Sequence, residues 1–479
     1  MAISSVGIGS GLDVESIVTQ MVELEKRPLK TLEAKAEFID AKISVQGQIS
    51  SMVSDLHDSL FDLTLEGTWK TSKVSASGSS VSASISGTAA VGSYNVNVSQ
   101  LAQSQTMVSA KLAADAKLGA GTFKFTVGNL STSVKEVELT GSETLTEVAQ
   151  KINDANFGVA ASVITGSDGK LQLVMTAKNT GLDGQFKLEV TAAAAGGSAT
   201  PIDTAWVGTF EPTAAVGTVG NAGFAMAQQA KNAKLTLNGV ELESSTNNFN
   251  TALAGVNLTV TGTGTSLLNV SNDTEAIKGK IQKFVDAYNA LNDLLTQSTK
   301  YTEDTKTAGV FQGDSSIVSM QNAFRLMTQT MVQGAGGAFS RLSDIGIQMA
   351  NPMSAKVSGE LTVSASKLDL ALGDLDSMRA LFATKANGTS GKTDGVAVTF
   401  RKFTSGLMDL EGTLRSKENA LDKEMERNEE EQARIEKRAA SLESRLRAQY
   451  TALDVKMASL NSLSSYVEQM VSSWNKSKD

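Results

Sequence analysis

The residue types that most enzymes use for catalysis are nearly absent from this chain. One histidine, His57, and no cysteine occur among its 479 residues. Zinc sites, Ser-His-Asp triads and most general-base mechanisms draw on histidine, and thiol catalysis needs a cysteine. The composition therefore argues against enzymatic chemistry, and we expect neither a catalytic residue, nor a cofactor, nor a metal site.

Three short motifs resemble functional sequences, and each has a simpler structural interpretation. Gly7, Gly9 and Gly11 follow no strand and precede no suitably placed lysine, which argues against a phosphate loop. Gly313-Asp314-Ser315 resembles a hydrolase nucleophile turn, but helix capping by Asp314 explains it better. The carboxylates of Glu429-Glu430-Glu431 belong to a solvated helix without a pocket.

Charge and hydropathy limit the partners that the chain can have. Forty-three basic and 51 acidic residues give a net charge of −8, which argues against nucleic-acid binding. No stretch approaches the roughly 18 apolar residues of a membrane span. The first twelve residues contain no lysine or arginine and no sustained apolar run, so we expect no cleavable signal peptide. A cysteine-free chain also suits export in an unfolded state.

The charges divide the chain into zones. Residues 71–272 contain 24 charged residues in 202, none of them arginine, whereas 415–449 contains 18 in 35 with interleaved signs. The second pattern is typical of a long solvated helix. The ends and the middle of the chain are therefore expected to form separate structures.

The C-terminal region has an apolar heptad repeat that predicts coiled-coil packing. Twelve of the sixteen a and d positions from 421 to 474 are apolar, and the other four are Asn428, Gln432, Gln449 and Lys456. A similar repeat near the N-terminus is interrupted at Pro28, where a helix should bend or restart. Each terminus can supply the partner helix that the other needs. The predicted packing residues are Leu421, Met425, Ile435, Ala439, Leu442, Leu446, Leu453, Leu460, Leu463, Val467, Met470 and Trp474, with Val14, Val18 and Met21.

The middle of the chain alternates apolar and polar residues, which predicts half-buried strands, for example around Val96 and Phe125. Asn238-Gly239 favours a tight hairpin. Thr144 with Glu147 fits the capping box of one helix among the strands. Residues 192–219 show no period and are expected to form a loop.

Helices return after residue 272. Apolar residues from Ile277 to Leu295 are spaced by three and four, and Asp314 precedes a second such segment. A hairpin is expected between Ile345 and Val363. We predict an α+β multidomain fold with helical coiled-coil ends, a leg domain of helices and strands, and two nested β-rich head domains. The predicted boundaries are 1–42 with 401–479, 43–70 with 273–400, 71–110 with 231–272, and 111–230.

The two ends resemble a known family. SSVGIGSGLDVESIVTQMVELEKRPL at 4–29 closely resembles the N-terminal signature of the bacterial flagellar filament cap family, also called hook-associated protein 2. LRAQYTALDVKMASLNSLSSYVEQMVSSW at 446–474 resembles its C-terminal helix, with Tyr450 where a phenylalanine is expected. Residues 119–190 are similar to a repeat module shared by flagellin and hook-associated proteins.

The resemblance implies a non-enzymatic protein that is exported unfolded through the flagellar type III channel to the extracellular filament tip. It implies a ring-like homo-oligomer, with a pentamer favoured, that has legs and helps flagellin fold and insert. Flagellin, the export apparatus with its chaperone, and host surface glycans are the other candidate partners. Two alternatives remain at this point: a surface adhesin or hook–filament junction protein, and a glycan-active enzyme, for which no carboxylate pair stands out.

Overall fold

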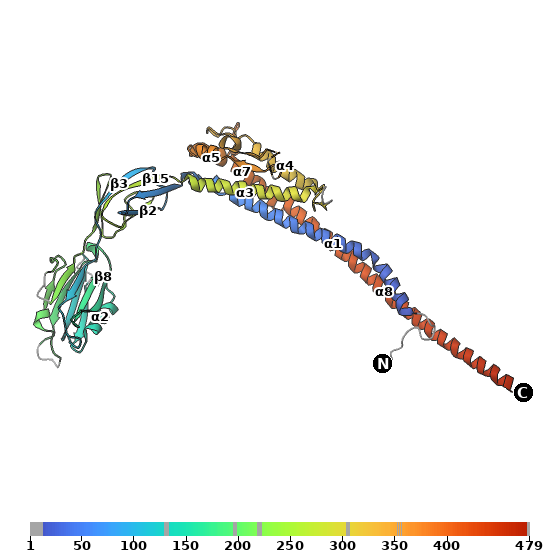
Figure 1. The fold of residues 1–479 in the computed structure, drawn as a ribbon, viewed down its shortest axis with the longest axis horizontal. Helices are drawn as coiled ribbons and strands as arrows, with labels where there is room; N and C mark the ends of the chain where they lie inside the picture. The colour runs from blue at the N-terminus through green and yellow to red at the C-terminus, as the bar shows by residue number, and fades with distance from the viewer. Residues whose placement is uncertain are drawn as a thin grey trace. The chain divides into compact units, whose positions relative to one another are not determined.

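The computed structural model describes residues 13–128, 134–194, 199–217, 223–302, 307–351, 353, 355 and 357–476 (Figure 1). The chain divides into two compact units. Unit 1 combines Met1–Trp69 with Glu275–Asp479, and unit 2 is Lys70–Thr274. The predicted finer division, into coiled coil and leg and into two heads, stays a prediction.

Two long helices dominate unit 1. Helix α1 spans Val14–Ser59 and begins at Asp13, whose carboxylate accepts a hydrogen bond from the Ser16 amide at 3.0 Å. Helix α8 spans Thr413–Lys476. The sequence predicted that the helix would bend or restart at Pro28. The restart is wrong, because α1 continues through this residue. Pro28 lies on the exposed side of the helix, where water can bind the carbonyl that lacks a partner, while Leu29 is buried.

The remaining elements of unit 1 pack around one apolar core that includes the last turns of α1. The ring of Phe400 lies at its centre, with ring centroids 5.5 Å from Phe284, 6.4 Å from Tyr288 and 6.2 Å from Phe324. The predicted hairpin is confirmed by antiparallel pairing of β18 with β19. The elements are η1 Asp62–Thr64, η2 Glu66–Lys70, α3 Thr274–Thr299, β16 Tyr301–Thr302, β17 Thr307–Ala308, α4 Ser315–Gln329, η5 Leu342–Ile345, β18 Ile347–Met349, β19 Leu361–Val363, α5 Ala365–Ala371, α6 Leu375–Ala383 and α7 Val396–Met408.

Unit 2 contains antiparallel sheets around two separate apolar cores. The first core lies between a five-stranded sheet, in the order β1-β15-β3-β12-β13, and the pair β14-β2. These strands are β1 Ser72–Ser77, β2 Val81–Ile85, β3 Gly92–Gln100, β12 Ala233–Leu237, β13 Val240–Ser244, β14 Val256–Val260 and β15 Gly264–Asn272. The turn at Asn238-Gly239 joins β12 to β13, which confirms the predicted hairpin.

The second core of unit 2 is enclosed by two four-stranded sheets, ordered β10-β9-β5-β6 and β11-β4-β8-β7, and by helix α2. Thr144 and Glu147 form the predicted capping box of α2. The loop expected at 192–219 is only partly correct, because a 3-10 turn and strand β10 bring Trp206 and Phe210 into this core. The elements are β4 Thr106–Ser109, β5 Ala120–Val127, β6 Val134–Thr140, α2 Leu145–Asp154, β7 Val159–Thr165, β8 Leu171–Ala177, η3 Leu182–Gly184, β9 Phe186–Ala192, η4 Thr204–Trp206, β10 Gly208–Phe210 and β11 Phe224–Gln228.

Candidate interaction surface on the terminal helices

Helices α1 and α8 pack side by side in opposite directions (Figure 1). Three ion pairs record the register: Glu15 with Arg447 at 2.6 Å, Glu25 with Arg438 at 3.3 Å, and Lys35 with Glu424 at 3.3 Å. As the residue number rises along α1, the number of its partner on α8 falls. The two ends of the chain therefore form an antiparallel pair, as the sequence predicted they could.

The first half of the α8 heptad repeat packs against α1. Ile435 and Ala439 are 8% and 0% exposed, and Val14 and Val18 on α1 are also buried. The other predicted packing residues in this half are buried or half-buried: Leu421, Met425, Leu442 and Leu446. Met21 is different, because it lies on the exposed side of α1.

Polar side chains interrupt this seam, as the sequence indicated. Asn428 is almost fully buried, and its Oδ1 accepts a hydrogen bond from Gln432 Nε2 at 2.6 Å. Its Nδ2 has no hydrogen-bond partner within the described part of the chain. Near the start of α8, Gln46 Nε2 donates to the carbonyl of Leu414 at 3.1 Å. Buried polar groups of this kind reduce stability while restricting a coiled coil to one register.

The second half of the repeat has no facing helix among the described residues. Arg447 pairs with the second residue of α1, and α8 then continues for about eight more turns, to Lys476. Within these turns Leu460 and Leu463 are each 58% exposed. The other apolar members of the seam that are exposed here are Leu453, Val467 and Met470, whereas the side chain of Trp474 lies outside the described residues. We call residues 451–476 the tail.

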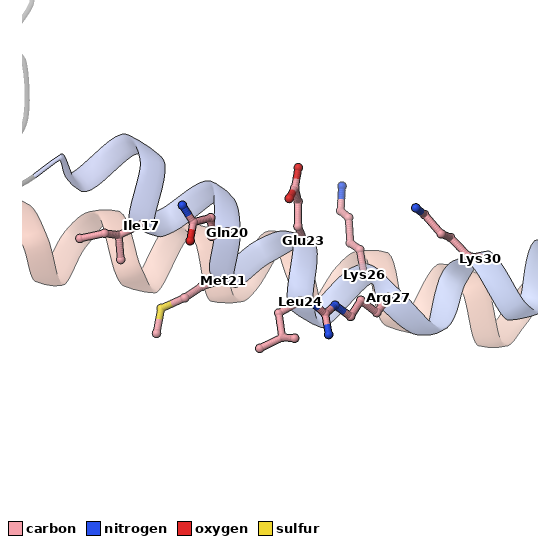
Figure 2. A pocket seen from close by; sticks show the side chains of 8 residues that line it. All are labelled: Ile17, Gln20, Met21, Glu23, Leu24, Lys26, Arg27 and Lys30. Carbon is pink, nitrogen blue, oxygen red and sulfur yellow. The ribbon is translucent and has the colours of Figure 1, made fainter.

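A further apolar row lies on the outer face of α1. Ile17, Met21 and Leu24 follow one another at helical spacing beside an open groove of about 760 Å³. Figure 2 shows Met21 and Leu24 pointing to one side of α1, and Glu23 and Lys26 pointing to the other. This face is amphipathic and is distinct from the face that packs against α8.

The start of α8 is bound to the N-terminal end of α4. Lys417 forms an ion pair with Asp314, and its ammonium also lies 5.6 Å from the centroid of the Phe311 ring. Burial tends to raise the pKa of Asp314, but the hydrogen bonds from Lys417 and Ser316 outweigh it, so the pKa is lowered. The same carboxylate caps α4 through the Ser316 and Ile317 amides, which confirms the predicted cap. Asp314 of the hydrolase-like motif Gly313-Asp314-Ser315 therefore has a structural role.

His57 also has a structural environment. Its Nδ1 lies 2.9 Å from Thr404 Oγ1, and Arg401 donates to its backbone carbonyl at 2.8 Å. Burial and the nearby Arg401 lower the pKa of the imidazole. Among the described residues, no group of three or more acidic or histidine side chains could hold a metal ion, and no helix has the length and apolar composition needed to cross a membrane. The glycines at 7, 9 and 11 lie outside the described residues.

Sequence reasoning missed two features of the interaction surface. The Glu15–Arg447 pair joins residues 432 positions apart, and no local pattern indicates it. The apolar row of Ile17 and Leu24 could have been found from its spacing of seven, but it overlaps the repeat that faces α8.

Comparisons with known proteins agree with this architecture. The family model described as "Flagellar hook-associated protein 2 C-terminus" matches residues 230–462, and the corresponding N-terminal model matches 10–105. The "Flagellin hook IN motif" matches 122–178, which lies within the second core of unit 2.

Curated relatives match over almost the full length. The A-type flagellar hook-associated protein 2 of Pseudomonas aeruginosa is 30% identical over 98% of this chain and 97% of its own. The flagellar hook-associated protein 2 of Escherichia coli K12 is 28% identical over 100% of both chains. The crystal structure of the D1-D2-D3 domains of the Escherichia coli flagellar cap protein FliD has a similar fold, with a TM-score of 0.57 and 24% identity, over 79% of this chain and 99% of that one. With such extensive matches to these relatives, the chain belongs to the flagellar hook-associated protein 2 family.

Proposed function

We propose that this protein is a structural cap at the distal tip of the bacterial flagellar filament. It would form a homo-oligomeric plate with legs, beneath which exported flagellin folds and polymerises. The observation that carries the proposal is the exposed apolar seam of the tail, since a helix with such a seam requires a partner. Membership of the family supports this role.

The proposed action is by packing and not by covalent chemistry. Two buried or half-buried carboxylates of the described residues have structural partners: Glu143 binds Lys151 and the amides of a turn, and Asp314 binds Lys417 and the amides of Ser316 and Ile317. A carboxylate held in this way cannot readily exchange a proton with a substrate. These arrangements support a non-enzymatic role.

Several partners follow from the proposal. The subunits would bind one another, and family resemblance favours a pentamer. The tail would contact flagellin within the filament, and before assembly it would need protection by the export apparatus and its chaperone. The protein would lie outside the cell, having been exported without a cleavable signal peptide. Nothing in the described residues favours the adhesin or the glycan-active enzyme over the cap.

The test replaces two apolar residues of the tail, Leu460 and Leu463, with serine. The paired region up to Arg447 is unchanged, so we expect the variant to fold with normal helix content. Because the seam is lost, oligomer mass measured by light scattering should fall, and cells that make only this variant should lose flagellin to the medium.

The matched control is Val455→Ser, which removes an exposed apolar side chain from the same tail but away from the seam. This control should assemble and support filament growth. Filaments of normal length with the Leu460→Ser, Leu463→Ser variant would contradict the proposed role of the seam. If both variants fail, the whole helix surface is needed and the heptad seam is not the decisive feature.

A further inference from the structure

The sequence contains two Asn-Gly dipeptides, Asn238-Gly239 and Asn387-Gly388, and the fold places both in the same kind of tight turn. The φ angles are +50° and +85° at the first pair and +46° and +76° at the second. Positive φ at both central residues is the pattern of a type I′ turn. All four residues are exposed. The chain therefore holds two chemically equal sites in two different settings.

Asn238 is anchored on several sides. Its Oδ1 accepts a hydrogen bond from the Asn95 amide at 2.7 Å, and its own amide donates to the Asn95 carbonyl at 2.9 Å. Leu237 and Val240, which flank the turn, pair in the β12-β13 ladder, and Leu237 also pairs with β3. Moving the Asn238 side chain requires breaking bonds that belong to a five-stranded sheet.

Asn387 lies in the connection between α6 and α7 and has no such anchor. One hydrogen bond closes its turn, from the Thr389 amide to the Ala386 carbonyl at 2.8 Å. The Ala386 amide donates to Asp394 Oδ1 at 2.9 Å, outside the turn itself. Within the described part of the chain, the Asn387 side chain makes no hydrogen bond. A Cβ built on Gly388 would meet open space, as it would on Gly239, so the two turns differ in their hydrogen bonds and sheet pairing and not in the space around the glycine.

We propose that Asn387 is a site of spontaneous deamidation in the folded protein, and that the fold protects Asn238 from the same reaction. The Gly388 backbone nitrogen attacks Cγ of Asn387, forming an N–C bond while the bond from Cγ to the side-chain nitrogen breaks. The proton of the Gly388 amide leaves with the NH₂ group as ammonia. The resulting succinimide takes up one water and opens to aspartate or isoaspartate. No metal, oxidant or enzyme is required.

The reaction changes the charge of a defined surface. Lys385, two residues before Asn387, lines a groove of about 470 Å³ together with Arg401 and Lys402. Each converted chain gains one negative charge beside this basic groove. The isoaspartate product also inserts a methylene into the backbone, which changes the geometry of the tight turn. The modification would therefore accumulate with the age of the molecule and alter the loop between α6 and α7.

The experiment follows both sites in the full-length protein by peptide mass spectrometry during incubation at mildly alkaline pH. One sample is folded and the other is in concentrated urea, and isoaspartyl methyltransferase labels the isoaspartate product. Both sites should react at similar rates in urea because both precede glycine. In the folded sample, Asn387 should keep a rate within about threefold of its urea rate, whereas Asn238 should slow by about tenfold or more, since its reaction requires local opening.

Two variants show which asparagine produces the isoaspartate signal. Asn387→Gln should abolish the dominant isoaspartate signal of the folded protein, and Asn238→Gln should leave it unchanged. Equal rates at the two sites in the folded protein would overturn the proposal, as would comparable protection of both. The outcome does not depend on the proposed cap function, because the assay needs neither assembly nor flagellin.

Discussion

The guanidinium of Arg447 donates two hydrogen bonds to the carboxylate of Glu15, at 2.7 and 2.6 Å, across 432 positions of sequence. This bidentate pair closes the contact between α1 and α8 and marks the point beyond which no described residue of α1 faces α8. The hydrogen bonds from Arg447 lower the pKa of Glu15, so the carboxylate is ionised at neutral pH. The pair therefore separates the coiled coil from the tail.

Arg447→Gln should loosen the start of α1 without unfolding the molecule. Exposed ion pairs contribute little to global stability, but this one restrains the terminal turn of a helix. We expect faster hydrogen exchange at residues 14–20 and an unchanged thermal midpoint. Arg445→Gln removes a charge of the same sign from the neighbouring turn and should have no effect on exchange. If the two variants behave alike, the change is a result of net charge and not of the bidentate contact.

Asn428→Leu should stabilise the coiled coil. The buried Nδ2 of Asn428 has no partner within the described residues, and leaving such a donor unsatisfied costs about 1 to 3 kcal/mol. Gln432, which loses its acceptor, is only half-buried and can bond to water. We expect slower hydrogen exchange in the middle of α1 and α8 and a gain of about 1 kcal/mol in the free energy of unfolding.

The same substitution should reduce specificity, because a buried asparagine favours one register. Paired cysteines at positions 25 and 438 can report the register, since the natural chain has no cysteine. In the Asn428→Leu background, we expect this cross-link to form less completely. A less stable variant with an unchanged cross-link would mean that Asn428 has a partner in the folded molecule.

The heptad repeat predicted the long C-terminal helix, but not the division of that helix into a paired half and a tail. Ile435 and Leu463 occupy the same d position and look equivalent in sequence, yet one is buried and the other exposed. The difference depends on where α1 begins, which is a property of another segment. Whether Leu463 packs against a neighbouring subunit stays a prediction.

The two errors of prediction have physical causes. Pro28 lacks an amide hydrogen, but the burial of the neighbouring Leu29 outweighs the loss of one hydrogen bond on the solvent side. Trp206 and Phe210 lie in a segment of small residues without a period, so only their aromatic character indicated burial. Local signals such as Asn238-Gly239 and Thr144 with Glu147 were reliable because the turn or cap is complete within a few residues.

Glu143 should make the second core of unit 2 sensitive to acid. Burial tends to raise the pKa of this carboxylate, but a hydrogen bond of 2.6 Å from Lys151 and others from Thr140 outweigh it, so the pKa is lowered. A lowered pKa contributes stability above the ordinary value of 4.5. That contribution should disappear as the pH falls from this value toward the lowered pKa of the folded state.

At neutral pH, Glu143→Gln should therefore destabilise unit 2 by about 1.5 to 3 kcal/mol, the typical range for hydrogen bonds to a charged group. The difference from the natural chain should shrink as the pH falls below 4.5, because Glu143 then takes up a proton when the protein unfolds. Urea unfolding at several pH values, followed by hydrogen exchange of α2, measures this. If Glu143→Gln lowers the free energy of unfolding by the same amount at every pH, the shape of the side chain and not its charge is responsible for the destabilisation.

Phe400→Ala should test whether the two units fold independently. Phe400 is fully buried in unit 1, and removing a buried aromatic ring costs about 3 to 5 kcal/mol because it leaves a cavity. We expect the unfolding of α3 and α7 to shift to lower temperature. The strands between Lys73 and Asn272 have their own two cores and should keep their thermal midpoint. Hydrogen-exchange rates of the strands of unit 2, measured in the same sample, show whether this unit unfolds separately from unit 1.

The isolated fragment 73–272 provides the matched measurement. If unit 2 is independent, the fragment should unfold cooperatively, with strand-like circular dichroism, at the midpoint that this unit shows in the full chain. In a cap, such independence would let unit 2 keep its structure while the helical ends change partners during growth of the filament. A fragment that fails to fold, or a Phe400→Ala chain whose strands unfold together with its helices, would mean that unit 2 depends on unit 1.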